Sequence, residues 1–174
     1  MKRRSIVCAL LSAALLMTTA ATPAVERQSA RPLSAFPREE IIIETPGARR
    51  HFFQAWRADT PASRAQGLMF VDRLGPGQAM VFVYGQPQQV AMWMKNTLIP
   101  LDMLFVDTDG CVAHVHEQAQ PGSLETIGAD VPVVLVIELA GGSVKRLGLA
   151  TGDRVLRPAA GWPATPAAAC RRTI

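Results

Sequence analysis

Residues 90–106 read VAMWMKNTLIPLDMLFV. Two apolar runs, 90–94 and 101–106, flank a short polar turn, and this pattern predicts two strands joined as a hairpin. Three polar side chains, those of Lys95, Asn96 and Asp102, lie within or beside this apolar sequence. Because burying a charge without a partner costs several kcal/mol or more, these groups must pair, reach solvent or contact a ligand. We therefore expect this hairpin to organise both the fold and the functional surface.

Short apolar segments on both sides of the hairpin predict a protein built mainly of strands. Residues 131–139 are almost continuously Val, Leu and Ile, which is typical of a strand buried on both faces. Thr60-Pro61 predicts a short helix that ends near Gln66, and residues 143–148 predict a second one. The other expected strands are residues 41–43, 51–58, 80–84, 111–116 and 154–156. The expected fold class is mainly β, an antiparallel sandwich or partly closed barrel with two short helices.

The N-terminus has the layout of a secretory signal. Met1–Arg4 is basic, residues 5–17 are almost wholly apolar, and small residues follow. The apolar run is shorter than the roughly 20 residues of a spanning helix, so we expect no stable membrane span in the mature chain. An uncut N-terminal anchor is the alternative. We expect export to the periplasm or the medium, after cleavage behind one of three alanines, Ala20, Ala21 or Ala24.

The expected organisation is a signal peptide at 1–24, a linker at 25–38, a single β domain at 39–157 and a Pro/Ala-rich tail at 158–174. Loss of the three basic residues of the signal lowers the formal charge from +4 to +1. No block of like charge remains, so we expect no nucleic-acid partner.

Two cysteines stay in the mature chain, Cys111 in an apolar context and Cys170 in the tail. An oxidising compartment permits a bridge between them. One buried thiol and one separate thiol in the tail are the alternative, since a tail fixes no distance between the two Cα atoms.

The turn of the predicted hairpin is the candidate ligand site. Lys95 and Asp102 flank this turn and meet across it, either as a structural pair or as a pair that faces a ligand. Trp93 supplies a flat apolar wall suited to a sugar, an aromatic ring or a cation, unless it belongs to the ordinary core. Asn96 either holds the turn through its own backbone or joins the site.

A metal site is an alternative that we do not assign, and we expect no cofactor. Thioethers suit Cu(I), and five methionines lie in one part of the chain, namely Met69, Met80, Met92, Met94 and Met103. His114 and His116 share one face of an expected strand, although two ligands alone rarely make a site. A nucleophilic hydrolase has little support, because the chain lacks a Gly-x-Ser-x-Gly motif.

Several motifs resemble, in order and spacing, the domain-of-unknown-function 192 family. They are RAQGLMF at 64–70, MVF at 80–82, WMKNTLIPLD at 93–102, VIELAGG at 136–142 and GD at 152–153. The resemblance covers about residues 39–157 and implies a compact, mainly β domain, often exported in bacteria and without an established activity. It adds Arg64 and Glu138 to the candidate ligand-binding residues Trp93, Lys95, Asn96 and Asp102. Met92 stands where the family usually has Phe, a change of volume that cores tolerate.

Three functions follow as hypotheses. The preferred one is a binding module for a small ligand or a component of the cell envelope. The second is a hydrolase in which Asp102 or Glu138 acts as the general base. The third is a periplasmic copper carrier that uses Met and His side chains.

Overall fold

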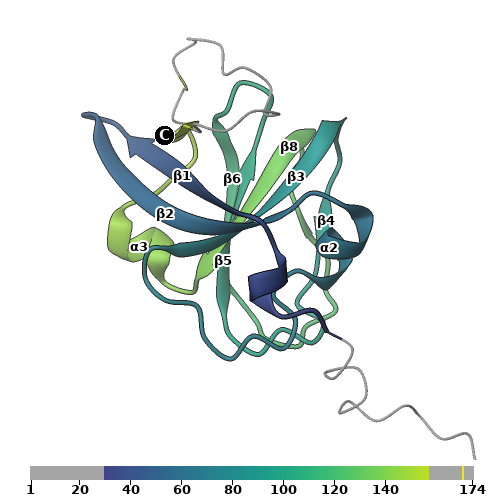
Figure 1. The fold of residues 1–174 in the computed structure, drawn as a ribbon. Helices are drawn as coiled ribbons and strands as arrows, with labels where there is room; N and C mark the ends of the chain where they lie inside the picture. Colours follow the sequence, from purple (N-terminus) through teal and green to yellow (C-terminus); the bar gives the residue numbers. More distant parts are fainter. Residues whose placement is uncertain (1–29, 157–169, 171–174) are drawn as a thin grey trace, which may run out of the picture.

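The computed structural model describes residues 30–156 and Cys170 (Figure 1). Within these residues the chain forms nine strands, two short α-helices and one 3-10 turn, so the prediction of a mainly β fold with two short helices is confirmed. In chain order the elements are η1 (Leu33–Ala35), β1 (Arg38–Thr45), β2 (Arg49–Ala58), α2 (Pro61–Gln66), β3 (Gln78–Gln88), β4 (Ala91–Met92), β5 (Leu101–Val106), β6 (Val112–Ala119), β7 (Ile127–Gly128), β8 (Val133–Ala140), α3 (Ser143–Leu147) and β9 (Arg154–Leu156). No helix in the described part of the chain has the length and apolar character needed to cross a membrane.

Seven of the strands form one twisted sheet in the order β6-β5-β8-β3-β2-β1-β9, and β4 pairs with β7 in a small second sheet (Figure 1). Every pairing is antiparallel except that of β2 with β3, which is parallel. A parallel pair needs a crossover, and α2 with the loop after it supplies this connection. The large sheet is not closed into a barrel, although its edges meet at one corner, where Cys111 and Arg154 form an isolated bridge.

The predicted hairpin between residues 90–94 and 101–106 is wrong. β4 pairs with β7, whereas β5 lies between β6 and β8. The reason is burial: all six residues of β5 are buried, so the backbone groups on both of its edges need partners from neighbouring strands. The segment between β4 and β5 is a loop that turns at Asn96, whose φ of 56° is a left-handed conformation that Asn tolerates.

Both helices lie where the sequence predicts them. Thr60 caps α2 through reciprocal hydrogen bonds with Ser63, Pro61 is the first helical residue, and Gly67 ends the helix. Gly67 has a φ of 51°, and a Cβ atom at this position would lie 3.0 Å from Cζ of Phe82. The N-cap of α3 is Gly142 in a left-handed conformation, rather than the expected Ser143.

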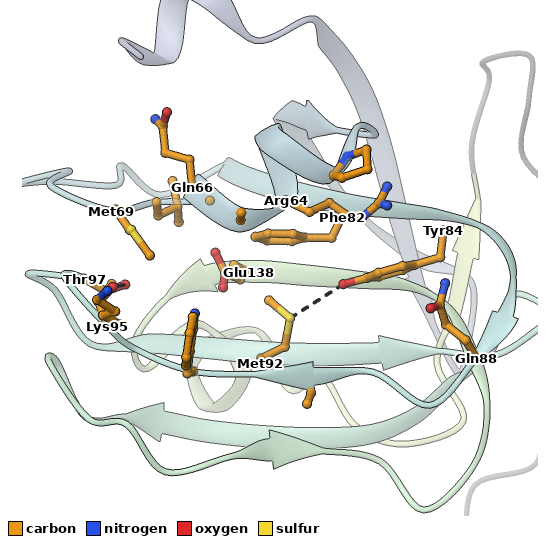
Figure 2. A pocket seen from close by; sticks show the side chains of 16 residues that line it. Arg64, Gln66, Met69, Phe82, Tyr84, Gln88, Met92, Lys95, Thr97 and Glu138 are labelled. Carbon is orange, nitrogen blue, oxygen red and sulfur yellow. Dashed lines mark hydrogen bonds between the residues drawn. The ribbon is translucent and has the colours of Figure 1, made fainter. Parts of the chain in front are cut away.

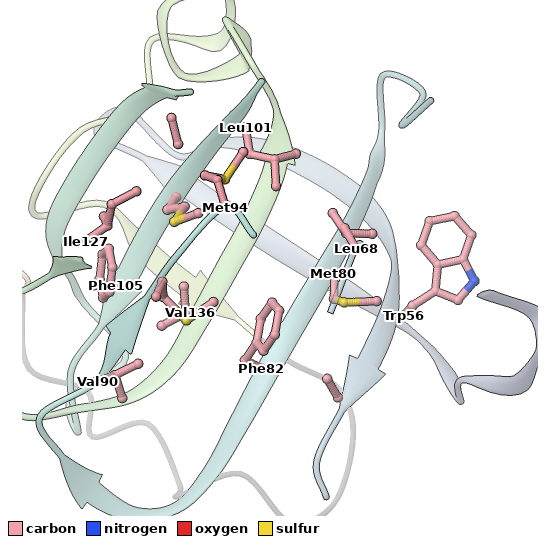
Figure 3. Close-up of a cluster of buried hydrophobic side chains, with 14 of the residues drawn as sticks. Trp56, Leu68, Met80, Phe82, Val90, Met94, Leu101, Phe105, Ile127 and Val136 are labelled. Carbon is pink, nitrogen blue, oxygen red and sulfur yellow. The ribbon is translucent and has the colours of Figure 1, made fainter. Parts of the chain in front are cut away.

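The sheet buries apolar side chains on both faces, as the continuous burial of β8 requires. One core cluster includes Trp56, Met80, Phe82, Phe105 and Val136 (Figure 3). The cluster on the opposite face is built from alternate residues of the same strands, with Ile41, Phe53, Val81, Ile137 and Leu139 among its members. Val136 of β8 therefore faces one core, whereas its neighbours Leu135 and Ile137 face the other.

The expected signal peptide lies outside the described residues, as does most of the expected tail. The end of the expected linker packs on the domain: Phe36 is buried, and the backbone of Arg31 exchanges two hydrogen bonds with the Gln66 side chain. Cys111 and Cys170 form a disulfide with their Cα atoms 5.5 Å apart, which decides between the two alternatives for these thiols.

Candidate functional site

A cavity of about 400 Å³ opens between α2, β3 and β4, with β8 at its base (Figure 2). Its apolar walls come from α2, β3, β4 and the loops after α2 and β4, and include Leu68, Met69, Phe82, Met92 and Trp93. Its polar groups belong to Arg64, Gln66, Tyr84, Gln88, Lys95, Thr97 and Glu138. Apolar walls with a few convergent polar groups are the usual composition of a site for a small organic molecule.

Among the residues that the structure describes, Glu138 is the one carboxylate that lines this cavity. It lies on β8 between Met80 of β3 and Met103 of β5, and strand alternation turns it away from the core that holds Ile137 and Leu139. Its carboxyl group points into the space bounded by Met69, Phe82 and Met92 (Figure 2). Glu138 is only 3% exposed, and its Oε2 has no hydrogen-bond partner among the described residues. Burial raises the pKa of this carboxyl group to about 8, so the acid is mostly protonated at neutral pH.

Arg64 lines the cavity and is fixed in place by its contacts. It lies in the last turn of α2, and its Nη1 donates hydrogen bonds to the carbonyl oxygens of Asp59 at 2.8 Å and Val83 at 2.9 Å. The guanidinium carbon lies 5.0 Å from the centre of the Tyr84 ring, in the geometry of a cation–π contact. These contacts fix the guanidinium group against the strand that carries Phe82 and Tyr84.

Tyr84 reaches across the cavity. Its hydroxyl donates a weak hydrogen bond to Sδ of Met92 at 3.8 Å (Figure 2). Burial raises the pKa of Tyr84 to about 12; the positive charge of Arg64 lowers it in part, and Glu138 adds to the rise. The phenol therefore stays neutral at physiological pH and acts as a hydrogen-bonding wall group.

Trp93 and Lys95, two of the predicted ligand-binding residues, also line the cavity. Both lie on the loop after β4, and the Trp93 side chain is 53% exposed at the cavity mouth. The two residues also line a second hollow of about 390 Å³, together with Gln66, Met69 and Ala30. The N-terminal segment thus contributes to the surroundings of the site.

Asp102 does not belong to the cavity, which corrects the prediction that it meets Lys95 or faces a ligand. It is fully buried, and its carboxylate accepts hydrogen bonds from the backbone N–H groups of Gln118, Gly142 and Val144 at 2.9, 3.1 and 2.8 Å. Gly142 and Val144 lie at the start of α3, where helical N–H groups have no partner within the helix. Asp102 therefore caps α3 from a neighbouring strand, and it has no access to serve as a general base.

Asn96 is a turn residue beside the site rather than one of its lining residues. Its carbonyl oxygen accepts a hydrogen bond from the Phe70 N–H at 2.9 Å, and its Nδ2 lies 3.9 Å from Sδ of Met69. These contacts tie the loop after β4 to the loop after α2, and so hold two walls of the cavity together.

The structure does not bring the expected copper ligands together. Met69 and Met92 line the cavity, whereas Met80, Met94 and Met103 are core residues and the two histidines lie on β6. Residues 30–156 and Cys170 contain no group of three or more His, Cys, Asp or Glu side chains that could hold a metal ion.

Sequence reasoning missed four polar lining residues, Gln66, Tyr84, Gln88 and Thr97. A usable signal existed for Tyr84, because Met80, Phe82 and Tyr84 alternate along one strand and so share a face. Gln88 and Thr97 carry no comparable signal, since their place at the cavity depends on how distant loops pack.

Comparison with known proteins agrees with the resemblance found in the sequence. A crystal structure of a proposed transcription regulator from Sinorhizobium meliloti 1021 is 41% identical, with a TM-score of 0.69, over 72% of this chain and 96% of that one. A protein of unknown function from Novosphingobium aromaticivorans DSM 12444 is 34% identical, also with a TM-score of 0.69, over 74% of this chain and 91% of that one. No curated protein matches the chain. The profile of DUF192, described as uncharacterized ACR, matches residues 41–156, so the chain belongs to this uncharacterised family.

Proposed function

We propose that the chain is a binding module whose cavity holds a small molecule, with Glu138 as the group that fixes it. The observation that carries this proposal is the Glu138 carboxyl group, buried and with one oxygen unpartnered at the base of a cavity of about 400 Å³. A buried polar atom without a partner costs about 1–3 kcal/mol, and a donor on a ligand would remove this cost. Sites of this size, between about 300 and 1,000 Å³, hold small organic ligands.

The mouth of the cavity supports the same proposal. Trp93 leaves half of a large aromatic side chain exposed beside the opening, where a ligand would cover it. Arg64 is held by two carbonyl oxygens and an aromatic ring, so it is fixed before any ligand binds. A preorganised site loses less conformational entropy on binding.

We also propose that the protein works outside the cytoplasm, on ligands found in the cell envelope or the medium. The basic and apolar N-terminal sequence supports this location, and the disulfide between Cys111 and Cys170 fits an oxidising compartment. Fractionation of cells that express the full chain tests it: we expect a shortened chain, cut before Val25, in the periplasm or medium. A full-length chain in the cytoplasm would contradict export.

The Sinorhizobium relative is described as a proposed transcription regulator, but the charge of this chain does not favour DNA binding. After residue 24 the formal charge is +1, and no run of basic residues is longer than two. Nucleic-acid binding surfaces are normally strongly basic.

Filling the cavity tests the binding function. Ala91 is exposed and lines the cavity, so Ala91→Trp should block the opening without disturbing the core. Ala113→Trp on β6 is the matched control, since Ala113 is not a lining residue. We expect small molecules from a metabolite library to raise the melting temperature of the wild type and of Ala113→Trp, but not of Ala91→Trp. A library that stabilises none of the three proteins, or all three equally, would refute a role for this cavity.

A further inference from the structure

Few charged or titratable side chains line the cavity, and their chemistry limits the class of ligand that could bind there. Among the described residues they are Arg64 from α2, Tyr84 from β3, Lys95 from the loop after β4 and Glu138 from β8. Lys95 takes part in an interaction within the protein, and Arg64 is held by the carbonyl oxygens of Asp59 and Val83. Oε2 of Glu138 is buried and has no hydrogen-bond partner among the described residues.

An ammonium group satisfies this carboxyl group better than a neutral donor. Arg64 directs its Nη1 to the carbonyl oxygens of Asp59 and Val83, and burial raises the pKa of Glu138. An ammonium group would bring both a positive charge and three N–H donors. The surrounding wall favours a cation as well, since Phe82 and Trp93 present aromatic rings and Met69 and Met92 present thioether sulfurs.

Two positively charged side chains of the cavity favour a negatively charged group on the ligand. Arg64 and Lys95 line the cavity from different elements, and each would repel a ligand that carried positive charge alone. A carboxylate on the same ligand would turn this repulsion into attraction, and Arg can bind a carboxylate with the N–H groups that are not used for Asp59 and Val83.

We infer that the ligand is an amino-carboxylate zwitterion, a free amino acid or short peptide, with its ammonium group on Glu138 and its carboxylate toward Arg64 or Lys95. This inference rests on the proposed function. Binding is then linked to a proton: Glu138 gives its proton to the buffer, and the carboxylate that remains pairs with the ammonium group of the ligand. No other bond forms or breaks.

The first experiment is a melting-temperature screen of the mature chain against the free amino acids and a set of dipeptides at millimolar concentration. We expect at least one compound to stabilise the protein, and we expect its N-acetylated form, which has no ammonium group, to give no shift. A panel without any stabilising compound, or an N-acetylated form that binds as well as its parent, would overturn the inference.

The second experiment measures the proton by titration calorimetry in two buffers of different ionisation enthalpy, with the compound found in the screen. We expect about 0.9 proton to be released per ligand at pH 7, as for a group whose pKa is about 8. Glu138→Gln should weaken binding at least tenfold and abolish the release. Glu117→Gln, at an exposed position on β6, is the matched control and should change neither. Binding without proton release, or full affinity in Glu138→Gln, would overturn the inference.

The two proposals fail separately. If the metabolite library yields an anion or a neutral molecule that needs an open cavity, the binding function stands and the zwitterion is wrong. If neither the library nor the amino-acid panel yields a compound that Ala91→Trp excludes, the binding function is wrong as well.

Discussion

Asp102 and Val144 are 42 residues apart in the chain, and Oδ2 of Asp102 accepts a hydrogen bond of 2.8 Å from the Val144 N–H. Its Oδ1 accepts hydrogen bonds from the N–H groups of Gln118 and Gly142. This buried carboxylate therefore joins β5 to β6 and to the start of α3. Asp102 therefore acts within the architecture, whereas Glu138, an equally buried acid on the adjacent strand, faces a cavity.

Asp102→Asn should destabilise the protein without removing the cavity. The amide keeps one acceptor, but its NH₂ group must face backbone donors, so we expect a loss of roughly 2–4 kcal/mol in the free energy of unfolding. Urea unfolding at neutral pH measures this loss. Ligand-induced stabilisation should persist under conditions in which the variant is folded, and its disappearance would return Asp102 to the list of ligand-facing residues.

Sequence patterns were reliable where the signal is local. The cap and the two ends of α2 follow from Thr60, Pro61 and Gly67, and the burial of β8 follows from its unbroken apolar run. The pairing of β4 with β7 could not be predicted from the sequence, because β7 is only Ile127–Gly128, which is too short to show any alternation. The parallel pairing of β2 with β3 was missed for a related reason, since the crossover contains just six helical residues.

The roles of the two buried acids show a second limit. Both lie in apolar strands, so the sequence indicates that each needs a partner or a task. The choice depends on which backbone N–H groups come near, and for Asp102 two of these belong to residues 40 and 42 positions away. The family resemblance made Glu138 a candidate ligand-binding residue without placing it at this cavity, whereas strand alternation alone could have indicated Tyr84.

Trp93→Ala should weaken ligand binding more than it weakens the fold. The side chain is 53% exposed, so we expect a change of less than about 1 kcal/mol in the free energy of unfolding. Loss of an aromatic wall at the cavity should lower ligand affinity about tenfold or more, in line with aromatic residues at binding sites. Phe52→Ala is the matched control, because Phe52 is 57% exposed on β2 and does not line the cavity. Thermal melts with and without ligand compare the two variants, and equal effects on affinity would exclude a specific role for Trp93.

Cys170→Ser should lower stability through loss of a long covalent loop. The disulfide links residues 59 positions apart, and a loop of this length stabilises a chain by up to about 4 kcal/mol through restriction of the unfolded state. We expect the wild type under reducing conditions to match the Cys170→Ser variant under oxidising conditions. Urea unfolding with and without reductant tests this equality. A wild type that is insensitive to reductant would show that the bridge contributes little or does not form.

The pH dependence of the free energy of unfolding should reveal the raised pKa of Glu138. Burial raises its pKa in the folded chain to about 8 from an ordinary value of 4.5, so the folded protein keeps a proton that the unfolded chain has already lost between these two values. The unfolded state then binds fewer protons, and stability falls as the pH rises from about 4.5 to about 8, with no further fall from this group above pH 8. The resulting loss in the free energy of unfolding is on the order of 3–5 kcal/mol.

Glu138→Gln cannot ionise, so it should be close to the wild type in stability at pH 5 and clearly more stable at pH 9. Urea unfolding of both proteins at pH 5, 7 and 9 gives the difference directly. A difference that stays constant across this range would mean that Glu138 is already ionised and paired in the folded protein, and the cavity would then lack the neutral acid on which proton-linked binding depends.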